Sequence, residues 1–182
     1  MDAWVWIVIA AAVVLVIVLL AMWLAARRRH RHLEGRFGSE YERTVDSADS
    51  RRKAERELRE REAQHAELEL RPLTDAARER YETQWAALQQ NFVDRPQVAV
   101  ADADSLVTDV MRDRGYPIDD FDAKSRLVSV DHPDVVENYR RGHGIYIKTI
   151  EGTASTEDLR QAVISYRALF EDLLREGAEP AR

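Results

Sequence analysis

An uncharged run near the N-terminus, from Ala3 to Ala26, constrains this chain more than any other feature. As a helix, the residues from Trp4 to Ala26 would extend for about 35 Å, at 1.5 Å per residue, and the hydrocarbon core of a bilayer is about 30 Å thick. Thirteen of these residues are Val, Ile or Leu, and together they favour insertion by about 4 to 8 kcal/mol. The run predicts a transmembrane anchor at residues 1–26, with the span at about 4–26.

A secretory signal peptide is the main alternative for an apolar run at this place. Only Met1 and Asp2 precede the run, so it lacks the basic residues that begin a signal peptide. The run is also longer than the apolar part of a signal peptide, about 7–15 residues, and no cleavage site with small residues follows it. These features favour a retained span over a cleaved signal.

Basic residues stand on only one side of the predicted span, where five arginines lie between residues 27 and 36. Because lysine and arginine near a span favour the cytoplasmic side, we expect a single-pass protein of the cell membrane with its N-terminus outside. The rest of the chain would then be cytoplasmic. Tryptophans at the two ends of the run, together with the arginines, are the predicted contacts with the membrane interface: Trp4, Trp6, Trp23, Arg27, Arg28, Arg29 and Arg31.

The body of the chain is acidic and contains no cysteine. The net charge is −6 overall, yet residues 1–36 carry +3, so residues 37–182 carry −9. An acidic body repels phosphate backbones, which argues against nucleic acid as a partner. The absence of cysteine excludes disulfide frameworks, thiolate zinc sites and cysteine nucleophiles.

Residues 27–71 are predicted to form a basic flank followed by a charged helical stalk. The segment LEGRFGSEYERT, residues 33–44, contains two glycines and shows no apolar period, so we expect a short mobile joint there. Residues 51–71 contain thirteen charged side chains. Their apolar positions do not repeat as a heptad, so a solvated helix is favoured over a coiled coil, with pairing to another protein as the alternative.

Residues 72–177 show the amphipathic pattern of an antiparallel helical bundle, and residues 178–182 form a tail. Apolar residues recur at helical spacing in segments at about 74–92, 96–114, 120–127, 132–150 and 155–174. No segment alternates convincingly with the period of a strand. The predicted fold class is therefore all-α: an N-terminal transmembrane helix, a charged juxtamembrane helical stalk and a small antiparallel helical bundle.

Local signals define several helix ends. Thr74 and Ser155 are suited to cap the helices that follow them. The RGYP segment predicts a helix stop in which Gly115 adopts a left-handed conformation and Tyr116 packs back onto the helix, as in a Schellman motif.

The segment SVDHPDVV predicts another helix start, with Asp131 or His132 as its cap and the following proline in the first turn. Gly142 and Gly144 weaken the middle of this helix by about 1 kcal/mol each relative to alanine. We therefore expect that the helix could break there.

Three stretches carry distinctive motifs, of which FVD-P, RGYP, SVDHP and TEDLR are the most specific. The stretches run from RPLTDAARERY to MRDRGYP, from LVSVDHP to RRGH and from STEDLR to EDLL, and they cover most of residues 70–175. Together they resemble a family of actinobacterial single-pass membrane or secreted helical proteins whose activity is uncharacterised. The resemblance implies a single N-terminal span and a helical domain, and it carries over no catalytic residue. The two glycines of RRGHGIYIKTI depart from the helical continuation typical of that family.

Candidate catalytic and metal-binding patterns are each better explained by structural roles. His132 is flanked by acidic residues, but these are also favoured at a helix N-terminus. His143 lies one turn from two tyrosines, as expected of a hydrogen-bonded and partly buried histidine. DADS and DDFD lack the remainder of a calcium loop, and the GHG segment lacks the strand and third glycine of a dinucleotide motif. We therefore predict no catalytic, metal-binding or cofactor-binding residue, and no enzyme.

The leading hypothesis is a membrane-anchored cytoplasmic module for protein–protein interaction or scaffolding, with the lipid bilayer and a protein as its partners. The alternative is a small-molecule or signal-sensing helical bundle at the membrane, with a ligand site near Tyr116, His132, Tyr139 and His143. A homo-oligomer is also left open, because Ala21 and Ala25 form a small-xxx-small pair of the kind found between membrane helices.

Overall fold

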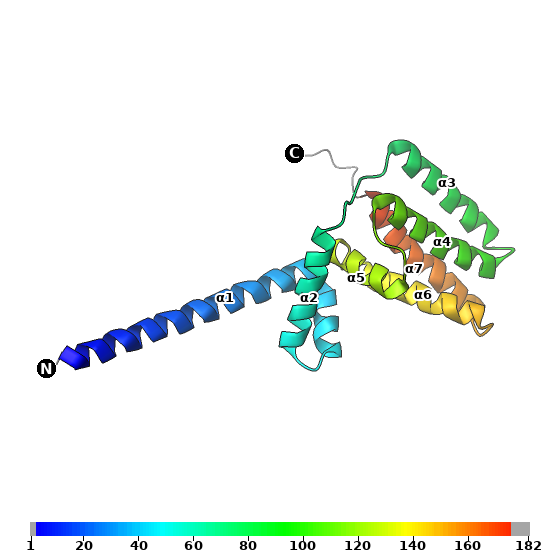
Figure 1. The fold of residues 1–182 in the computed structure, drawn as a ribbon. Helices are drawn as coiled ribbons and strands as arrows, with labels where there is room; N and C mark the ends of the chain where they lie inside the picture. The colour runs from blue at the N-terminus through cyan, green and yellow to red at the C-terminus, as the bar shows by residue number, and fades with distance from the viewer. Residues whose placement is uncertain (1–2, 176–182) are drawn as a thin grey trace.

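A computed structural model describes residues 3–175, apart from the side chains of residues 3, 5–11, 26 and 29. The described residues form seven helices and no strand, which confirms the all-α fold class. The helices are α1 (Ala3–Ser47), α2 (Arg51–Ala66), α3 (Asp75–Asn91), α4 (Pro96–Arg114), α5 (Phe121–Asp131), α6 (Val136–Ile150) and α7 (Thr156–Arg175) (Figure 1).

The N-terminal part of α1 projects away from the other helices (Figure 1). Between Val13 and Leu24 its large apolar side chains are 44–65% exposed. Over the residues that are described, no helix is both long and apolar enough to cross a membrane. The predicted span at 4–26 includes residues 5–11 and 26, whose side chains lie outside the described residues, as do those of the predicted interface residues Trp6 and Arg29.

Residues 33–44 are helical on both sides of Gly38, whose own backbone is not helical, so the expected joint is a kink at one residue rather than a segment without regular structure. Leu33 and Phe37 lie four residues apart on one face of α1 before the kink, Tyr41 follows the kink, and all three are buried. Charged and polar residues fill the positions between them and hide this spacing in the sequence. A kink at Gly38, where φ is +46°, turns the last part of α1 so that it runs beside α2 (Figure 1). Glycine suits this place because it adopts positive φ without strain.

Helix α2 was predicted, but it is packed against its neighbours rather than solvated on all sides. Ala54 and Leu58 are fully buried. The apolar residues that α1, α2 and α5 bury together form a small core of their own, named here the hairpin core: Leu33, Phe37, Tyr41, Leu58 and Val130. The last part of α1 and α2 are therefore a helical hairpin docked on α5.

Helices α3 to α7 enclose the main hydrophobic core. Helix α7 packs against both α4 and α6, α3 packs on α4, and α5 connects this bundle to α1 and α2. The apolar stripes predicted for α4 and α7 provide much of the core, including Val107, Val110, Leu169 and Leu173, each fully buried. The core thus lies where the helical periodicity placed it.

The predicted caps of this bundle are present. The Thr74 hydroxyl accepts a hydrogen bond from the Ala77 N–H at 3.2 Å, and the Ser155 hydroxyl accepts one from the Asp158 N–H at 3.1 Å. Gly115 has a φ of +95°, and the Tyr116 N–H donates to the Met111 carbonyl at 3.0 Å. These contacts confirm the expected Schellman motif.

Two predictions about α6 are wrong. The helix begins at Val136 rather than at residue 131 or 132, because α5 continues to Asp131 and His132 closes it by donating its N–H to the Val128 carbonyl. The helix also continues unbroken through both of its glycines. A Cβ atom at Gly142 would lie 3.1 Å from the Tyr166 ring, so glycine allows α6 to approach α7 closely.

Candidate functional site

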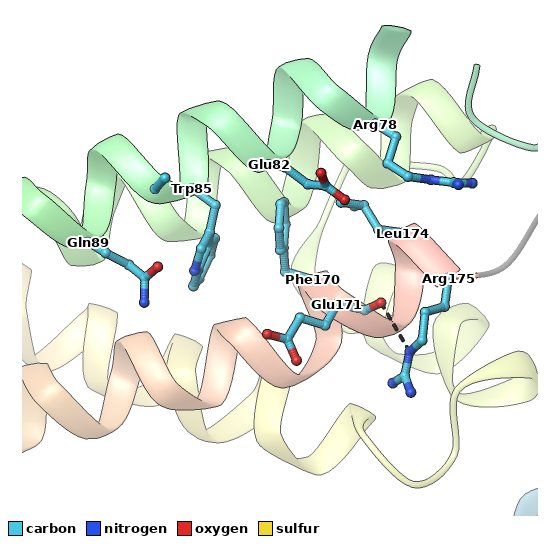
Figure 2. Close-up of a pocket in the computed structure, with 9 residues that line it drawn as sticks. Arg78, Glu82, Trp85, Gln89, Phe170, Glu171, Leu174 and Arg175 are labelled. Atoms are coloured by element: carbon cyan, nitrogen blue, oxygen red, sulfur yellow. Dashed lines mark hydrogen bonds between the residues drawn. The ribbon is translucent and has the colours of Figure 1, made fainter. Parts of the chain in front are cut away.

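A groove of about 580 Å³ lies between α3 and α7 (Figure 2). Its residues come from one face of each helix. Helix α3 contributes Arg78, Glu82, Trp85, Ala86 and Gln89, and helix α7 contributes Phe170, Glu171, Leu174 and Arg175.

Two stacked aromatic rings form the floor of this groove. The ring centroids of Trp85 and Phe170 are 4.6 Å apart and their planes are inclined by only 22°. Both residues are buried, because they belong to the apolar stripes of their helices. The aromatic pair bridges α3 and α7, and Ala86 and Leu174 extend the apolar surface along the groove.

Several polar groups of the groove are already paired. The Arg175 Nε donates to the Glu171 carbonyl at 3.4 Å, drawn as a dashed line in Figure 2, and its Nη2 donates to Asp172 at 2.9 Å. The Glu171 carboxylate accepts a hydrogen bond from Arg167 at 2.5 Å. The charged side chains on the α7 side of the groove are therefore already paired within α7.

Other polar groups of the groove have no partner within residues 3–175. Arg78 forms no ion pair there, and its Nε is a buried donor without an acceptor. The Trp85 indole Nε1 is also buried without an acceptor. Buried donors usually have a hydrogen-bond partner. Both atoms are covered by the surrounding protein, so the surface that the groove offers to a ligand is its apolar floor together with the exposed side chains along its edges.

The four residues predicted as a ligand site lie in two separate clusters, and none of them lines the groove. In the first cluster, His132 is 2% exposed and its Nδ1 lies 2.7 Å from an Asp172 oxygen. The Tyr116 hydroxyl donates to Asp131 at 3.1 Å, and the rings of Tyr116 and His132 are 6.5 Å apart.

In the second cluster, the His143 ring stacks on Phe121 at 3.7 Å, and Phe121 also contacts the Tyr139 ring at 5.0 Å. The His143 Nδ1 lies 3.3 Å from Asp104, whose carboxylate also accepts a hydrogen bond from Tyr166 at 2.7 Å. Tyr139 is fully buried. The second cluster thus resembles a hydrogen-bonded aromatic core more than an open site.

Asp131 of the first cluster and Asp104 of the second have lowered pKa values, which favours their ionised form. Burial opposes ionisation of Asp131, but hydrogen bonding and charge from His65, with help from Tyr116 and Arg36, lower its pKa below the usual value. Burial likewise opposes ionisation of Asp104, and its hydrogen bonds outweigh that effect, so its pKa is lowered too. In the part of the chain that is described, no group of three or more His, Asp or Glu side chains is placed to hold a metal ion.

A buried ion network connects the α1–α2 hairpin to the bundle. The Glu40 carboxylate, only 1% exposed, accepts hydrogen bonds from Arg61 at 2.7 Å and from Arg140 at 2.7 and 2.8 Å. Burial raises the pKa of Glu40, but Arg140 and Arg61 more than compensate, and the pKa is lowered overall. No local sequence pattern predicts this contact, because its three members come from α1, α2 and α6.

No family model, curated protein or solved structure matches this chain. The resemblance to the actinobacterial membrane or secreted proteins therefore stays a prediction. The groove is not predicted from the sequence either: Trp85 and Phe170 belong to the apolar segments at about 74–92 and 155–174, and no sequence pattern indicates that these two segments face one another.

Proposed function

We propose that this chain is a membrane-anchored cytoplasmic module for protein–protein interaction. Helix α1 would fix it in the bilayer, and the groove between α3 and α7 would dock a partner protein. The continuity of α1 carries the proposal. One helix begins in an exposed apolar segment and, before the kink at Gly38, already contributes Leu33 and Phe37 to the hairpin core. Such a helix ties a folded domain to a surface without a flexible linker.

The chemistry of the exposed segment supports the anchor. Large apolar side chains that are 44–65% exposed on every side of a helix require an apolar solvent, and lipid is the natural one. Trp4 and Trp23 are 63% and 54% exposed, as suits the two interfaces. The Arg27 guanidinium lies 5.2 Å from the centre of the Trp23 ring, which puts the first cation beside the second interfacial tryptophan. Arg28 and Arg31, also predicted at the interface, are exposed.

The shape and charge of the groove support a helical partner. The groove follows α3 from Arg78 to Gln89, about 16 Å of helix, which matches three turns of an amphipathic helix laid along it. Apolar side chains of that helix would cover Trp85 and Phe170. A carboxylate near one end of it would pair with Arg78.

A small-molecule ligand is the second candidate, favoured by the size of the groove. Its volume of about 580 Å³ falls within the range of small-molecule sites, about 300–1,000 Å³. An amphiphilic carboxylate would use the same aromatic floor and the same Arg78 guanidinium. The two candidates can be distinguished by the mass of the bound molecule, which is that of a protein in the first case and of a small molecule in the second.

The docking proposal is tested by site-specific photo-crosslinking of the full chain in native membranes, with the crosslinking residue at Gln89. Ala86→Arg fills the groove, whereas Ala87→Arg changes the neighbouring residue, which faces the α3–α4 side. We expect a discrete protein adduct that disappears in Ala86→Arg and persists in Ala87→Arg. An adduct indifferent to both changes contradicts groove docking, and a groove-dependent adduct below about 1 kDa identifies a small-molecule ligand instead.

The anchor is tested separately by alkaline carbonate extraction of the same membranes. A spanning helix keeps the full chain in the membrane pellet, because alkaline carbonate removes peripheral proteins and leaves inserted helices in place. Release of the chain into the supernatant contradicts the anchor.

A further inference from the structure

A row of three arginines lies on the outer face of α2. Arg52, Arg56 and Arg59 are spaced by four and three residues, which places them on one side of the helix. All three are exposed. The opposite side of α2 is the one buried in the fold, by Ala54, Leu58 and Arg61.

These arginines have no ionic partner within residues 3–175, while most acidic residues of α2 are engaged elsewhere. Glu55 and Glu62 lie 3.2 and 2.9 Å from His30 and His32 of α1, and Glu57 pairs with the buried Arg61. Glu60, at the edge of the row, is the one exposed acidic residue beside it. The outer face of α2 is therefore a positively charged stripe, named here the arginine stripe: Arg52, Arg56 and Arg59.

The contacts between α1 and α2 show which way the arginine stripe faces. Deep in the hairpin, Phe37 of α1 packs with Leu58 on the buried side of α2. Nearer the apolar run, His32 contacts Glu62, at the flank of α2. Nearer still, Arg28 lines one cavity of about 270 Å³ together with Arg59 of the stripe. Residues of α1 that are closer to its N-terminus thus contact positions of α2 that are closer to the arginine stripe. The stripe therefore faces the apolar end of α1.

The separation between α2 and the predicted span is short. From residue 26 to Leu33, where α1 first enters the hairpin core, there are seven residues, or about 10 Å of helix. The polar headgroup region adds about 5–8 Å to each side of the hydrocarbon core. Long arginine side chains directed toward the bilayer from α2 therefore reach headgroup phosphates. Helix α2 also crosses α1 rather than continuing its direction (Figure 1).

We propose that α2 lies along the cytoplasmic surface of the membrane and that the arginine stripe binds the phosphate groups of anionic lipids. This proposal rests on the proposed anchoring of α1. It assigns a lipid class to a surface of the folded domain, beyond the basic residues that flank the span, and it would fix how the α1–α2 hairpin is oriented on the membrane.

The test uses the full chain reconstituted in vesicles, with an environment-sensitive fluorophore on Ala63→Cys, an exposed position one turn beyond Arg59 on the same side of α2. The label is unique because the chain contains no cysteine. We compare neutral phosphatidylcholine vesicles with vesicles containing 30% phosphatidylglycerol, and we measure quenching by lipids with a spin label on the headgroup. The triple variant Arg52→Gln, Arg56→Gln, Arg59→Gln removes the stripe. Its matched control removes three exposed arginines of the bundle that have no ion pair in the described residues: Arg95, Arg126 and Arg141.

We expect headgroup quenching to rise at least twofold in anionic vesicles, and the rise to vanish in the stripe variant but not in the control. It should also fall as salt is raised from 0.1 to 1 M, since the screening length shortens from about 10 to 3 Å. Quenching that is the same in neutral and anionic vesicles overturns the proposal. A rise in quenching that persists in the stripe variant also overturns it. Loss of the rise in anionic vesicles on adding inorganic phosphate, but not on adding chloride at the same ionic strength, assigns the stripe to a soluble anion and overturns it too. Carbonate extraction of the same vesicles separates these results from a failure of the anchor, in which the chain leaves both kinds of vesicle.

Discussion

The described residues form two hydrophobic cores, which are held together in different ways. The bundle core contains 23 buried apolar residues, whereas the hairpin core contains five. The hairpin core is supplemented by the buried carboxylate of Glu40 with its two arginines and by Asp131, which is contacted by Arg36 at 3.0 Å and by His65 at 2.6 Å. A small apolar core leaves ion pairs to decide how the hairpin docks. We therefore expect the stability of the α1–α2 hairpin, next to the predicted membrane, to depend mainly on substitutions that change charge. The stability of the bundle should depend mainly on substitutions that change the volume of buried side chains.

Glu40→Ala should have the largest effect, and mainly in the hairpin. Removing the carboxylate takes away the buried counter-charge that Arg61 and Arg140 share and leaves them only the more exposed Glu57 and Glu137. Breaking a buried pair in this way costs about 3–5 kcal/mol. Hydrogen exchange of the full chain should show loss of protection in residues 39–66 with little change in α7. Glu60→Ala, an exposed acidic residue of α2, is the control, with an effect within about 0.5 kcal/mol. Equal loss of protection in both cores would show that they are not separate.

Leu169→Ala tests the other core. The residue is fully buried on α7, and a deletion of this size in a packed core costs about 2–5 kcal/mol. Thermal unfolding should shift to lower temperature, and hydrogen exchange should locate the lost protection in α4, α6 and α7. Ile164→Ala, on the same helix but 48% exposed, should shift it far less. A similar shift for both variants would mean that the core does not lie where burial places it.

Acid should open the hairpin before the bundle. Glu40 and Asp131 have lowered pKa values in the folded chain, so their stabilisation is complete above their unfolded values, 4.5 and 3.8, and is lost as the pH falls through the folded ones. The bundle has Asp104 with the same direction of shift, but its apolar core is larger. Hydrogen exchange at pH 5, 4 and 3 should show α2 losing protection first. Simultaneous loss in α2 and α7, or earlier loss in α7, would contradict the difference.

The smallest effect distinguishes two glycines of α6. Gly144→Ala should stabilise the bundle by about 0.5–1 kcal/mol, because a Cβ atom at Gly144 would contact no neighbouring atom and alanine is the better helix former. Gly142→Ala gains the same propensity but presses a methyl group against the Tyr166 ring, and overpacking costs about 1–3 kcal/mol. Denaturant unfolding should therefore order the variants as Gly144→Ala, wild type, Gly142→Ala. Stabilisation by both changes would show that α6 and α7 have room to separate.

The two cores also differ in how well the sequence predicts them. Thr74, Ser155 and Gly115 form cap hydrogen bonds with residues three or four positions away, so their caps could be inferred from local spacing alone. The burial of Leu33, Phe37 and Tyr41 is not predicted, because two glycines and several charges surround them and the kink at Gly38 interrupts their four-residue spacing. Contacts between segments that are distant in the sequence cannot be inferred from local spacing. The ion pair of Glu40 with Arg140 and the stacking of Trp85 on Phe170 are two examples.

Membrane topology is the most direct test of the central claim that α1 anchors a cytoplasmic domain. Because the chain has no cysteine, single cysteines placed at Asp2 and at Glu60 report the two sides of the membrane to a maleimide that cannot cross it. Intact cells should label Asp2→Cys, and Glu60→Cys should react only after the cells are opened. Labelling of Glu60→Cys in intact cells, or recovery of the chain from the culture medium, would contradict the claim.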